Sequence, residues 1–340
     1  MTKTQSSLFD LNFDQLQTLM SEWGESSFRA KQIWDWLYVR LADRYGVMSN
    51  IAAPLKERLK IEFPFNRLTP KIDLLSSDHW TRKILFTLPD GAQIETVLMD
   101  YDSRHTVCVS TQAGCAMGCT FCATGQGGFQ RNLSSGEIVE QVLFFDRELR
   151  QSENNANRKV QDVSQHRLTN LVFMGMGEPF ANYTESMDAV QRLSDPTGYN
   201  FGARRITVST VGLVPMIERF TQETSQVNLA VSLHAATDEL RESMLPITKR
   251  YSLSMLMAAC RAYTEQTHRR ISFEWALIEG INDTPEQARL LGRLIKGMLC
   301  HVNMIPLNPT RDFAGQASTR DRIAAFRSVL DLYKIPNTLR

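Results

Sequence analysis

Long apolar runs are missing from this chain of 340 residues. A helix that crosses a bilayer needs roughly 20 mostly apolar residues, and no segment of the sequence approaches that length. Residues 1–7 also lack the apolar core of a secretory signal peptide. The sequence therefore predicts a cytoplasmic protein whose thiols stay reduced.

An imbalance of charge is missing too. The chain has 38 Lys and Arg residues against 37 Asp and Glu residues, which gives a net charge of +1. Bulk electrostatics therefore gives no support for nucleic-acid binding. Basic pairs such as Arg82 with Lys83 and Arg269 with Arg270 are interpreted as solvated or ion-paired. An RNA substrate has to be argued from other features.

Cysteine is sparse, and six residues in a chain of this length argue against a disulfide framework. Three of them are nevertheless crowded together: Cys115, Cys119 and Cys122 have the spacing CxxxCxxC. Three thiolates on one loop can hold three irons of a [4Fe–4S] cube and leave the fourth iron open for chemistry. A zinc site completed by Cys108 or His105 is the alternative, although structural zinc sites usually have two separated pairs of ligands. The spacing favours the cluster.

Hydrophobic periodicity divides the chain into three parts. Residues 1–65 are predicted to be a helical accessory domain, with one short helix following Pro54. Residues 66–103 are predicted to be a linker with a β-hairpin, since two alternating segments flank a Pro-Asp-Gly turn at 89–91. Residues 104–340 alternate between strands and helices, which is typical of a parallel sheet.

Six βα units in this third part predict an α/β fold with a partial (βα)6 barrel. Its strands are expected at 106–110, 168–173, 205–210, 228–233, 271–275 and 302–306. Helices are expected at 135–150, 184–193, 253–267, 285–298 and 319–333, and an exposed loop at 151–165. Enzymes of this kind place their chemistry at the carboxyl ends of the strands.

Candidate ligand-binding residues follow several of these strands: Glu178, Ser209, Ser232, His234 and Asn308. Glu178 lies in a Gly-Met-Gly-Glu-Pro run, where glycine lets the backbone approach a ligand and the carboxylate could accept hydrogen bonds from an ammonium group. An ordinary Gly-Pro turn is the alternative. A lone His234 would more often be structural, but its position beside the other candidates favours ligand binding.

Six segments carry a resemblance to a known family. They are VCVSTQAGCAMGCTFCATG at 107–125, GGFQRNLSSGEI at 127–138, VFMGMGEPFANY at 172–183, RRITVSTVGLVP at 204–215, LAVSLHAATDELRESMLPI at 229–247 and NMIPLNP at 303–309. With SFRAKQIWDWL at 27–37, they resemble in order the RlmN/Cfr family of radical S-adenosylmethionine (SAM) RNA-adenosine methyltransferases, and RlmN more closely. The resemblance covers about residues 10–340 and implies a radical SAM barrel.

The resemblance also implies roles for individual residues. Cys115, Cys119 and Cys122 would hold the [4Fe–4S] cluster, and SAM would be contacted by Gly177, Glu178, Ser209, Ser232, Leu233, His234 and Asn308. Glu95 would be a proton acceptor and Cys108 a base that also forms a disulfide. Without the resemblance, these two would be interpreted as a surface carboxylate and a buried core cysteine. Cys260 and Cys300 are interpreted as structural.

The implied mechanism uses two SAM molecules. The first methylates a protein cysteine near the C-terminus, and the second gives a 5′-deoxyadenosyl radical that removes hydrogen from that methyl group. The carbon radical adds to C2 of an adenine in 23S rRNA or tRNA, and a disulfide with Cys108 forms as the product leaves. The base has to be unstacked to reach the pocket. An electron donor such as flavodoxin or ferredoxin is implied, and a monomer is expected.

One family feature is missing, because no cysteine follows Cys300. In the family, the methyl-bearing cysteine lies in an Ala-Cys-Gly-Gln-Leu type segment beyond the last helix. One hypothesis is a truncated family member that binds cluster and SAM but does not methylate RNA, since residues 337–339 look like the start of a strand. The alternatives are a divergent radical SAM enzyme, a Cfr-like C8 methyltransferase, or a non-catalytic metal- or RNA-binding protein.

Overall fold

The computed structural model describes residues 7–65, 67–101, 104–155 and 167–340. The chain forms two compact units, each built from separate stretches of sequence. The first unit comprises the described parts of Met1–Ala113, Arg131–Met176 and Asn182–Ile206. The second comprises Gly114–Gln130, Gly177–Ala181 and Thr207–Arg340.

The first unit begins with the predicted helices, which are α1 (Phe13–Glu22), α2 (Ser27–Trp34) and α3 (Ala53–Glu62). The side chain of Ser26 caps α2 by accepting a hydrogen bond from the backbone N–H of Phe28. Pro54 lies in the first turn of α3, where its missing N–H costs nothing. After Trp34 the chain continues as a π-helical turn over Asp35–Val39, which the periodicity did not indicate.

A sheet in the first unit has the strand order β1-β2-β3-β4-β7. Its strands are β1 (Thr69–Leu75), β2 (Thr81–Thr87), β3 (Gln93–Tyr101), β4 (Arg104–Cys108) and β7 (Asn170–Phe173). Pairing is antiparallel from β1 to β4, and β4 pairs with β7 in parallel. The predicted hairpin is confirmed as β2 and β3. The edge strand β1 is exposed along its whole length, so its sequence carries no alternation that would have revealed it.

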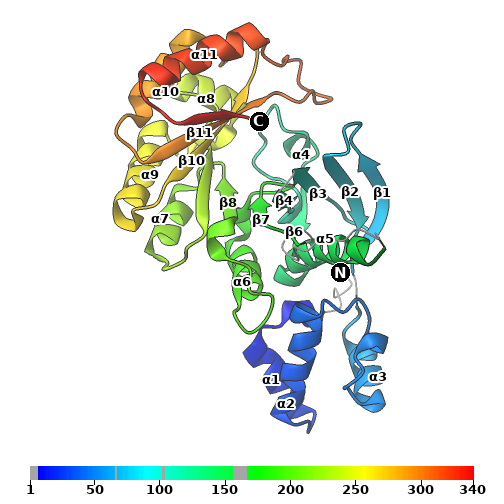
Figure 1. Ribbon diagram of the computed structural model, residues 1–340. Helices are drawn as coiled ribbons and strands as arrows, with labels where there is room; N and C mark the ends of the chain where they lie inside the picture. The colour runs from blue at the N-terminus through cyan, green and yellow to red at the C-terminus, as the bar shows by residue number, and fades with distance from the viewer. Residues whose placement is uncertain (1–6, 66, 102–103, 156–166) are drawn as a thin grey trace. The chain divides into compact units, whose positions relative to one another are not determined.

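Helix α5 (Ser135–Asn155) packs on this sheet (Figure 1). Gln141 fixes the contact, because its side chain bonds the Thr96 hydroxyl and both the N–H and the C=O of Ser110. The predicted loop at 151–165 is wrong for 151–155, where α5 continues, and residues 156–166 lie outside the described residues. Helix α6 (Tyr183–Ser194) follows β7 as expected.

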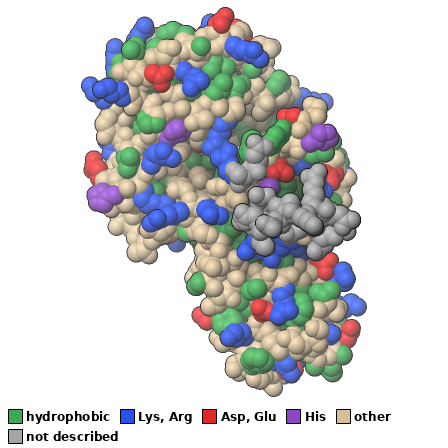
Figure 2. All heavy atoms as spheres, viewed as in Figure 1, with side chains coloured by type: hydrophobic (Ala, Val, Ile, Leu, Met, Phe, Trp, Pro, Cys, Tyr) green, Lys and Arg blue, Asp and Glu red, His purple; other side chains and the backbone are tan. Residues whose placement is uncertain are grey.

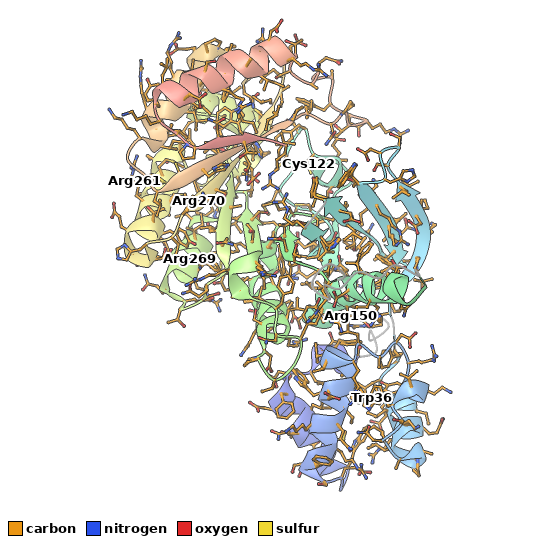
Figure 3. The ribbon with its side chains drawn as sticks, viewed as in Figure 1. Trp36, Cys122, Arg150, Arg261, Arg269 and Arg270 are labelled. Atoms are coloured by element: carbon orange, nitrogen blue, oxygen red, sulfur yellow. The ribbon has the colours of Figure 1, made fainter. Side chains whose placement is uncertain are left out.

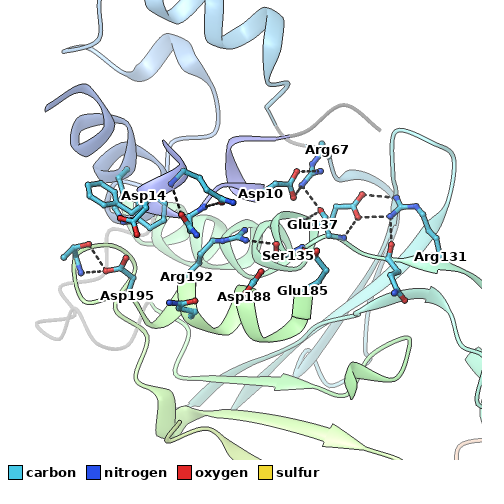
Figure 4. A pocket seen from close by; sticks show the side chains of 18 residues that line it. Asp10, Asp14, Arg67, Arg131, Ser135, Glu137, Glu185, Asp188, Arg192 and Asp195 are labelled. Carbon is cyan, nitrogen blue, oxygen red and sulfur yellow. Dashed lines mark hydrogen bonds and ion pairs between the residues drawn. The ribbon is translucent and has the colours of Figure 1, made fainter. Parts of the chain in front are cut away.

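A polar cavity of about 710 Å³ lies in the first unit near α5 and α6 (Figure 4). Its arginines are occupied by neighbouring groups: Arg67 bonds Asp10 at 2.9 Å, Arg131 bonds Glu137 at 2.8 Å, and Arg192 bonds the Ser135 hydroxyl. The Arg67 side chain is 3% exposed and also bonds Glu140, which is 2% exposed, at 3.1 Å. These buried pairs indicate that the cavity wall serves the structure.

Replacing Arg67 with methionine is expected to lower the free energy of unfolding by about 3–5 kcal/mol, because two carboxylates lose their buried partner. Chemical denaturation measures the change. Arg289→Met is the control, since that arginine forms an exposed pair with Glu286 and its loss should cost less than about 1 kcal/mol. Equal effects of the two substitutions would contradict the role of the buried network.

The second unit contains five parallel strands in the order β8-β9-β10-β11-β12. They are β8 (Ile206–Thr210), β9 (Asn228–Ser232), β10 (Ile271–Leu277), β11 (Cys300–Pro306) and β12 (Asn337–Leu339). The helices that connect or follow them are α7 (Val214–Gln222), α8 (Asp238–Met244), α9 (Leu253–Thr267), α10 (Pro285–Ile295) and α11 (Arg320–Leu332), drawn around the strands in Figure 1. With β4 and β7, strands β8 to β11 confirm the six predicted βα strands. β12 confirms the strand start expected at 337–339.

The surface agrees with the small net charge. Figure 2 shows Lys and Arg side chains spread over one face, with Asp and Glu side chains between them. Arg82 pairs with Asp73 at 2.7 Å, and Lys83 pairs with Glu95 at 3.1 Å, as expected for solvated pairs. Within the described part of the chain, no helix is long and apolar enough to span a membrane.

Candidate functional site

The cysteine loop belongs to the second unit and is closed by a backbone contact at its base. The N–H of Cys115 donates to the carbonyl of Gly128 at 2.8 Å. Gly114 has φ +78°, and a Cβ on it would lie 1.9 Å from the Gly128 oxygen. Only glycine therefore fits at the start of the loop. Cys122, labelled in Figure 3, directly precedes the short helix α4 (Ala123–Gln126).

The three thiols differ in exposure but lie within electrostatic reach of one another. Cys115 is 9% exposed, while Cys119 and Cys122 are half-buried. Burial raises the pKa of Cys119 to about 12; Cys122 and Cys115 add to the rise, and Arg241 opposes it. Binding a metal centre would therefore release the proton of Cys119.

Among the described residues, no group of three or more His, Cys, Asp or Glu side chains is arranged to hold one metal ion. This does not favour the zinc alternative, in which four ligands meet around a single ion. In a [4Fe–4S] cluster each cysteine binds a different iron, so the three thiolates need not converge on one point.

Aromatic and apolar contacts tie the cysteine loop to the strand ends of the second unit. The ring of Phe121 packs edge-on against His234, with 4.9 Å between ring centroids. Cys119 and Phe121 also pack against a buried cluster that includes Val211 and Met244. The aromatic residue before the last cysteine thus has a structural role, which is to hold the loop against the end of β9.

Glu178 lies after β7 and is 4% exposed. One carboxylate oxygen accepts a hydrogen bond from the N–H of Phe180 at 3.0 Å, and the other accepts one from the N–H of Val211, just after β8, at 2.7 Å. Burial raises the pKa of Glu178 to about 7, against the lowering effect of these bonds. The side chain is therefore held at the ends of two successive strands, where it can pair with a cationic group. The preceding Gly177 has φ +101°, which supports its predicted need for glycine.

His234 is 7% exposed and adopts φ +57°. Its Nδ1 accepts a hydrogen bond from the N–H of Ala276 at 2.9 Å, so the proton of the neutral ring is on Nε2. Burial, aided by Arg241, lowers the pKa of His234 to about 3, and the ring is neutral at physiological pH. The carbonyl of His234 accepts from Asn282. The histidine is thus both locked by the fold and able to donate one hydrogen bond from Nε2.

The remaining predicted SAM contacts also lie at the carboxyl edge of the parallel strands. Ser209 is the penultimate residue of β8 and pairs with Ala230 of β9. Ser232 ends β9, and Leu233 next to it is fully buried. Asn308 is exposed, two residues beyond the end of β11. The second unit thus contains the cysteine loop and every predicted SAM contact.

The two predicted catalytic residues lie in the first unit. In the antiparallel β3–β4 pair, Val97 is opposite Cys108, so Glu95 and Cys108 project from the same face of the sheet. Glu95 is 41% exposed and pairs with Lys83, which fits the interpretation as a surface carboxylate. Cys108 is buried, and burial raises its pKa to about 12. All six cysteines are free thiols, so the structure does not support the disulfide expected of Cys108.

Sequence reasoning missed one residue of the second unit. Arg241 on α8 is fully buried and bonds the carbonyls of Ser232 and Leu233, the same run predicted to contact SAM. A single arginine within a helical segment has no spacing that distinguishes it from a surface residue, so no sequence signal was available. A buried pair formed by Glu274 of β10 and Asn303 of β11, with an oxygen–nitrogen distance of 2.8 Å, was missed as well, because neither strand's sequence shows that the two residues face each other.

The basic pair Arg269 and Arg270 lies away from this site. Arg269 and Arg270 precede β10 and mark the amino end of the strands, whereas Cys122 lies toward the opposite end (Figure 3). Arg269 donates to the carbonyls of Ser225 and Val227, which indicates a structural role.

Comparisons with known proteins agree with this geometry. Residues 6–63 match the family described as "Ribosomal RNA large subunit methyltransferase N-terminal domain", and residues 109–291 match the "Radical SAM superfamily". A probable dual-specificity RNA methyltransferase RlmN from Chloroflexus aurantiacus is 49% identical over 99% of this chain and 89% of its own length. Dual-specificity RNA methyltransferase RlmN 1 from Myxococcus xanthus is 46% identical over 99% of this chain and 90% of its own length.

A solved structure shows the same fold. The crystal structure of a radical SAM methyltransferase from Sphaerobacter thermophilus superposes with a TM-score of 0.93 and 46% identity, covering 98% of this chain and 95% of that chain. The predicted radical SAM fold is thereby confirmed. The chain belongs to the RlmN family of dual-specificity RNA methyltransferases, within the radical SAM superfamily.

Proposed function

We propose that this chain carries the catalytic site of a radical SAM enzyme that methylates C2 of adenosine in 23S rRNA and tRNA. One observation carries the proposal: the second unit contains a loop with three free cysteines together with the buried carboxylate and strand-end groups that would bind SAM. Family membership supports the choice of RNA as substrate.

The residues present fit the cofactors of the superfamily, a [4Fe–4S] cluster and SAM. Cys115, Cys119 and Cys122 would hold the cluster, and the contact between Phe121 and His234 would fix their loop. When bound, the reduced cluster supplies the electron that cleaves SAM to a 5′-deoxyadenosyl radical.

The side chains after the strands would bind and orient SAM. Glu178 would accept hydrogen bonds from its ammonium group, with Gly177 allowing close approach of the backbone. The locked His234 would donate from Nε2. Ser209, Ser232, Leu233 and Asn308 would line the remainder of the molecule.

Two residues of the first unit would handle protons. Glu95 is half-exposed and can accept a proton, whereas Cys108 is a buried thiol that would act as a base only after its environment changes.

We also propose the division into an accessory domain at 1–65, a linker at 66–103 and a catalytic core at 104–340. The enzyme would act as a monomer in the cytoplasm, where its RNA substrates are made, with flavodoxin or ferredoxin as the electron donor.

SAM binding is expected to weaken in acid. Glu178 has a raised pKa of about 7, so its carboxylate form predominates above pH 7 and is lost as the pH falls through that value. The dissociation constant of SAM should rise about tenfold per pH unit below 7. Equilibrium dialysis with the cluster-loaded protein between pH 6 and pH 8 measures it. The variant Glu178→Gln should bind SAM weakly, with a dissociation constant that does not depend on pH in this range. The same pH dependence in the variant would contradict the assignment of Glu178.

The proposed activity is tested with anaerobically reconstituted protein, methyl-labelled SAM, a reductant and ribosomal or transfer RNA. Because no cysteine follows Cys300, the assay is run on the 340-residue chain and on a version extended by a family-type cysteine segment. Labelled 2-methyladenosine in the digested RNA is expected from the extended version, which supplies the methyl-bearing cysteine that the mechanism needs. 8-methyladenosine would indicate Cfr-like chemistry. Production of 5′-deoxyadenosine without methyladenosine in both versions would favour a divergent radical enzyme.

A further inference from the structure

Arg241 is a buried cation whose hydrogen-bond partners among the described residues are neutral. The residue is fully buried on α8. Its guanidinium donates to the carbonyls of Val211, Ser232 and Leu233 and to the hydroxyl of Thr248. The bonds satisfy four of its five N–H groups, but none of these four acceptors is a carboxylate that would balance its charge.

The same helix touches the cysteine loop. The carbonyl of Met244, at the end of α8, accepts a hydrogen bond from the N–H of Thr120, which follows Cys119. Cys119 itself packs against the buried cluster that contains Met244 and Leu245. Leu240, the residue before Arg241, packs against the same cluster, so α8 and the cysteine loop share one buried contact surface.

Within the part of the chain that the structure describes, Asp238 is the one carboxylate with an electrostatic effect on Arg241, and burial, which lowers the pKa of Arg241, outweighs it. Asp238 also accepts a hydrogen bond from the N–H of Leu253 at 2.6 Å. An unbalanced buried charge costs several kcal/mol. A bound group of negative charge would offset this cost.

A [4Fe–4S] cluster with three thiolates supplies that charge. An oxidised cube carries two positive charges, so three thiolates give the site a net charge of minus one, and one added electron makes it minus two. A fixed cation nearby stabilises the reduced state more than the oxidised state.

We propose that Arg241 is a positioning residue that balances the charge of the cluster and joins the ends of β8 and β9 to the cysteine loop. The inference rests on the proposed function, because it requires the cluster at Cys115, Cys119 and Cys122. Arg241 makes transfer of one electron from an external low-potential donor to the cluster more favourable. Its bonds to Ser232 and Leu233 also hold the backbone against which SAM would lie.

The test compares Arg241→Met, which removes the charge, with Arg241→Lys, which keeps it. Reconstituted proteins are titrated with dithionite, and the reduced cluster is followed by electron paramagnetic resonance. Arg241→Met should be at least tenfold harder to reduce, a shift of about 59 mV to lower potential for a one-electron couple. The reduction potential of Arg241→Lys should lie closer to that of the wild-type protein. Arg250→Met is the control, since that neighbouring arginine is exposed and should leave the potential unchanged.

Iron content and thermal unfolding are measured on the same samples. If Arg241→Met binds no iron, the iron content of Arg241→Lys becomes the criterion. Iron binding by Arg241→Lys supports the role of the positive charge, and a lack of iron in that variant too overturns the proposal. A full iron content with an unchanged potential in Arg241→Met also overturns the proposal. None of these readouts uses RNA. A failure to methylate RNA is therefore distinguishable from a failure of the role proposed for Arg241.

Discussion

Replacing Cys119 with alanine is expected to abolish iron binding and SAM cleavage together. Only three cysteines lie in the loop, and a cube held by two thiolates loses a ligand from one iron. Iron and sulfide should fall from about four of each per chain to near zero. Formation of 5′-deoxyadenosine should fall by roughly 100-fold or more. Both quantities are measured on anaerobically reconstituted protein.

Cys300→Ala is the matched control, because Cys300 is buried at the start of β11 and outside the loop. Its removal should cost some stability but leave iron content and SAM cleavage near those of the wild type. If Cys119→Ala kept a full cluster, or if Cys300→Ala lost it, the assignment of the ligands would be wrong.

Replacing Gly114 with alanine is expected to prevent the cysteine loop from closing. The added Cβ would lie 1.9 Å from the Gly128 oxygen and 2.9 Å from its carbon, both backbone atoms that cannot rotate away. The hydrogen bond from Cys115 to Gly128 would be lost with the close approach. We therefore expect less than about half of the wild-type iron content, read by metal analysis after reconstitution.

Gly128→Ala separates this clash from backbone strain. Gly128 has φ +73°, close to the φ of +78° at Gly114, but a Cβ added to it would meet no described atom within 4 Å. The substitution should cost about 1–2 kcal/mol through the left-handed backbone alone and still allow iron binding. Similar iron loss in both variants would show that strain, and not the contact at the base of the loop, is decisive.

Regular elements with a buried face were predictable from the sequence. Helix α9 was expected at 253–267 and spans Leu253–Thr267, because Ser252 caps it and its apolar residues recur on one side. The mostly buried strands β9 and β10 likewise appeared as short apolar runs between turns. In these segments, local propensity and burial favour the same structure.

Elements that depend on distant contacts were not predictable. The pair β5 (Gln112–Gly114) and β6 (Phe129–Asn132) forms only because the cysteine loop closes on itself, and neither strand has an apolar pattern. The short helix α8 was missed because seven residues are too few to show a helical period. Arg241 was missed with it, since its burial depends on bonds to the carboxyl ends of two strands, at Val211 and Ser232.

The candidate site was also predictable only in part from the sequence. The cysteine spacing and the family resemblance predicted the cluster ligands, and the strand ends pointed to Glu178 and His234 as candidates. The sequence could not show that Glu178 bonds Val211 or that Ala276 fixes the tautomer of His234, because those partners lie 33 and 42 residues away. These contacts fix the orientation of both side chains, which are proposed to bind SAM.

The central claim is that the second unit holds a [4Fe–4S] cluster with one iron open to SAM. The most direct test is electron paramagnetic resonance of the reduced, reconstituted protein, recorded with and without SAM. We predict a spectrum typical of a reduced [4Fe–4S] cluster whose g-values change when SAM is added, because SAM would ligate the open iron. A cluster spectrum unaffected by saturating SAM, or a protein that binds zinc in place of iron and sulfide, would contradict the account.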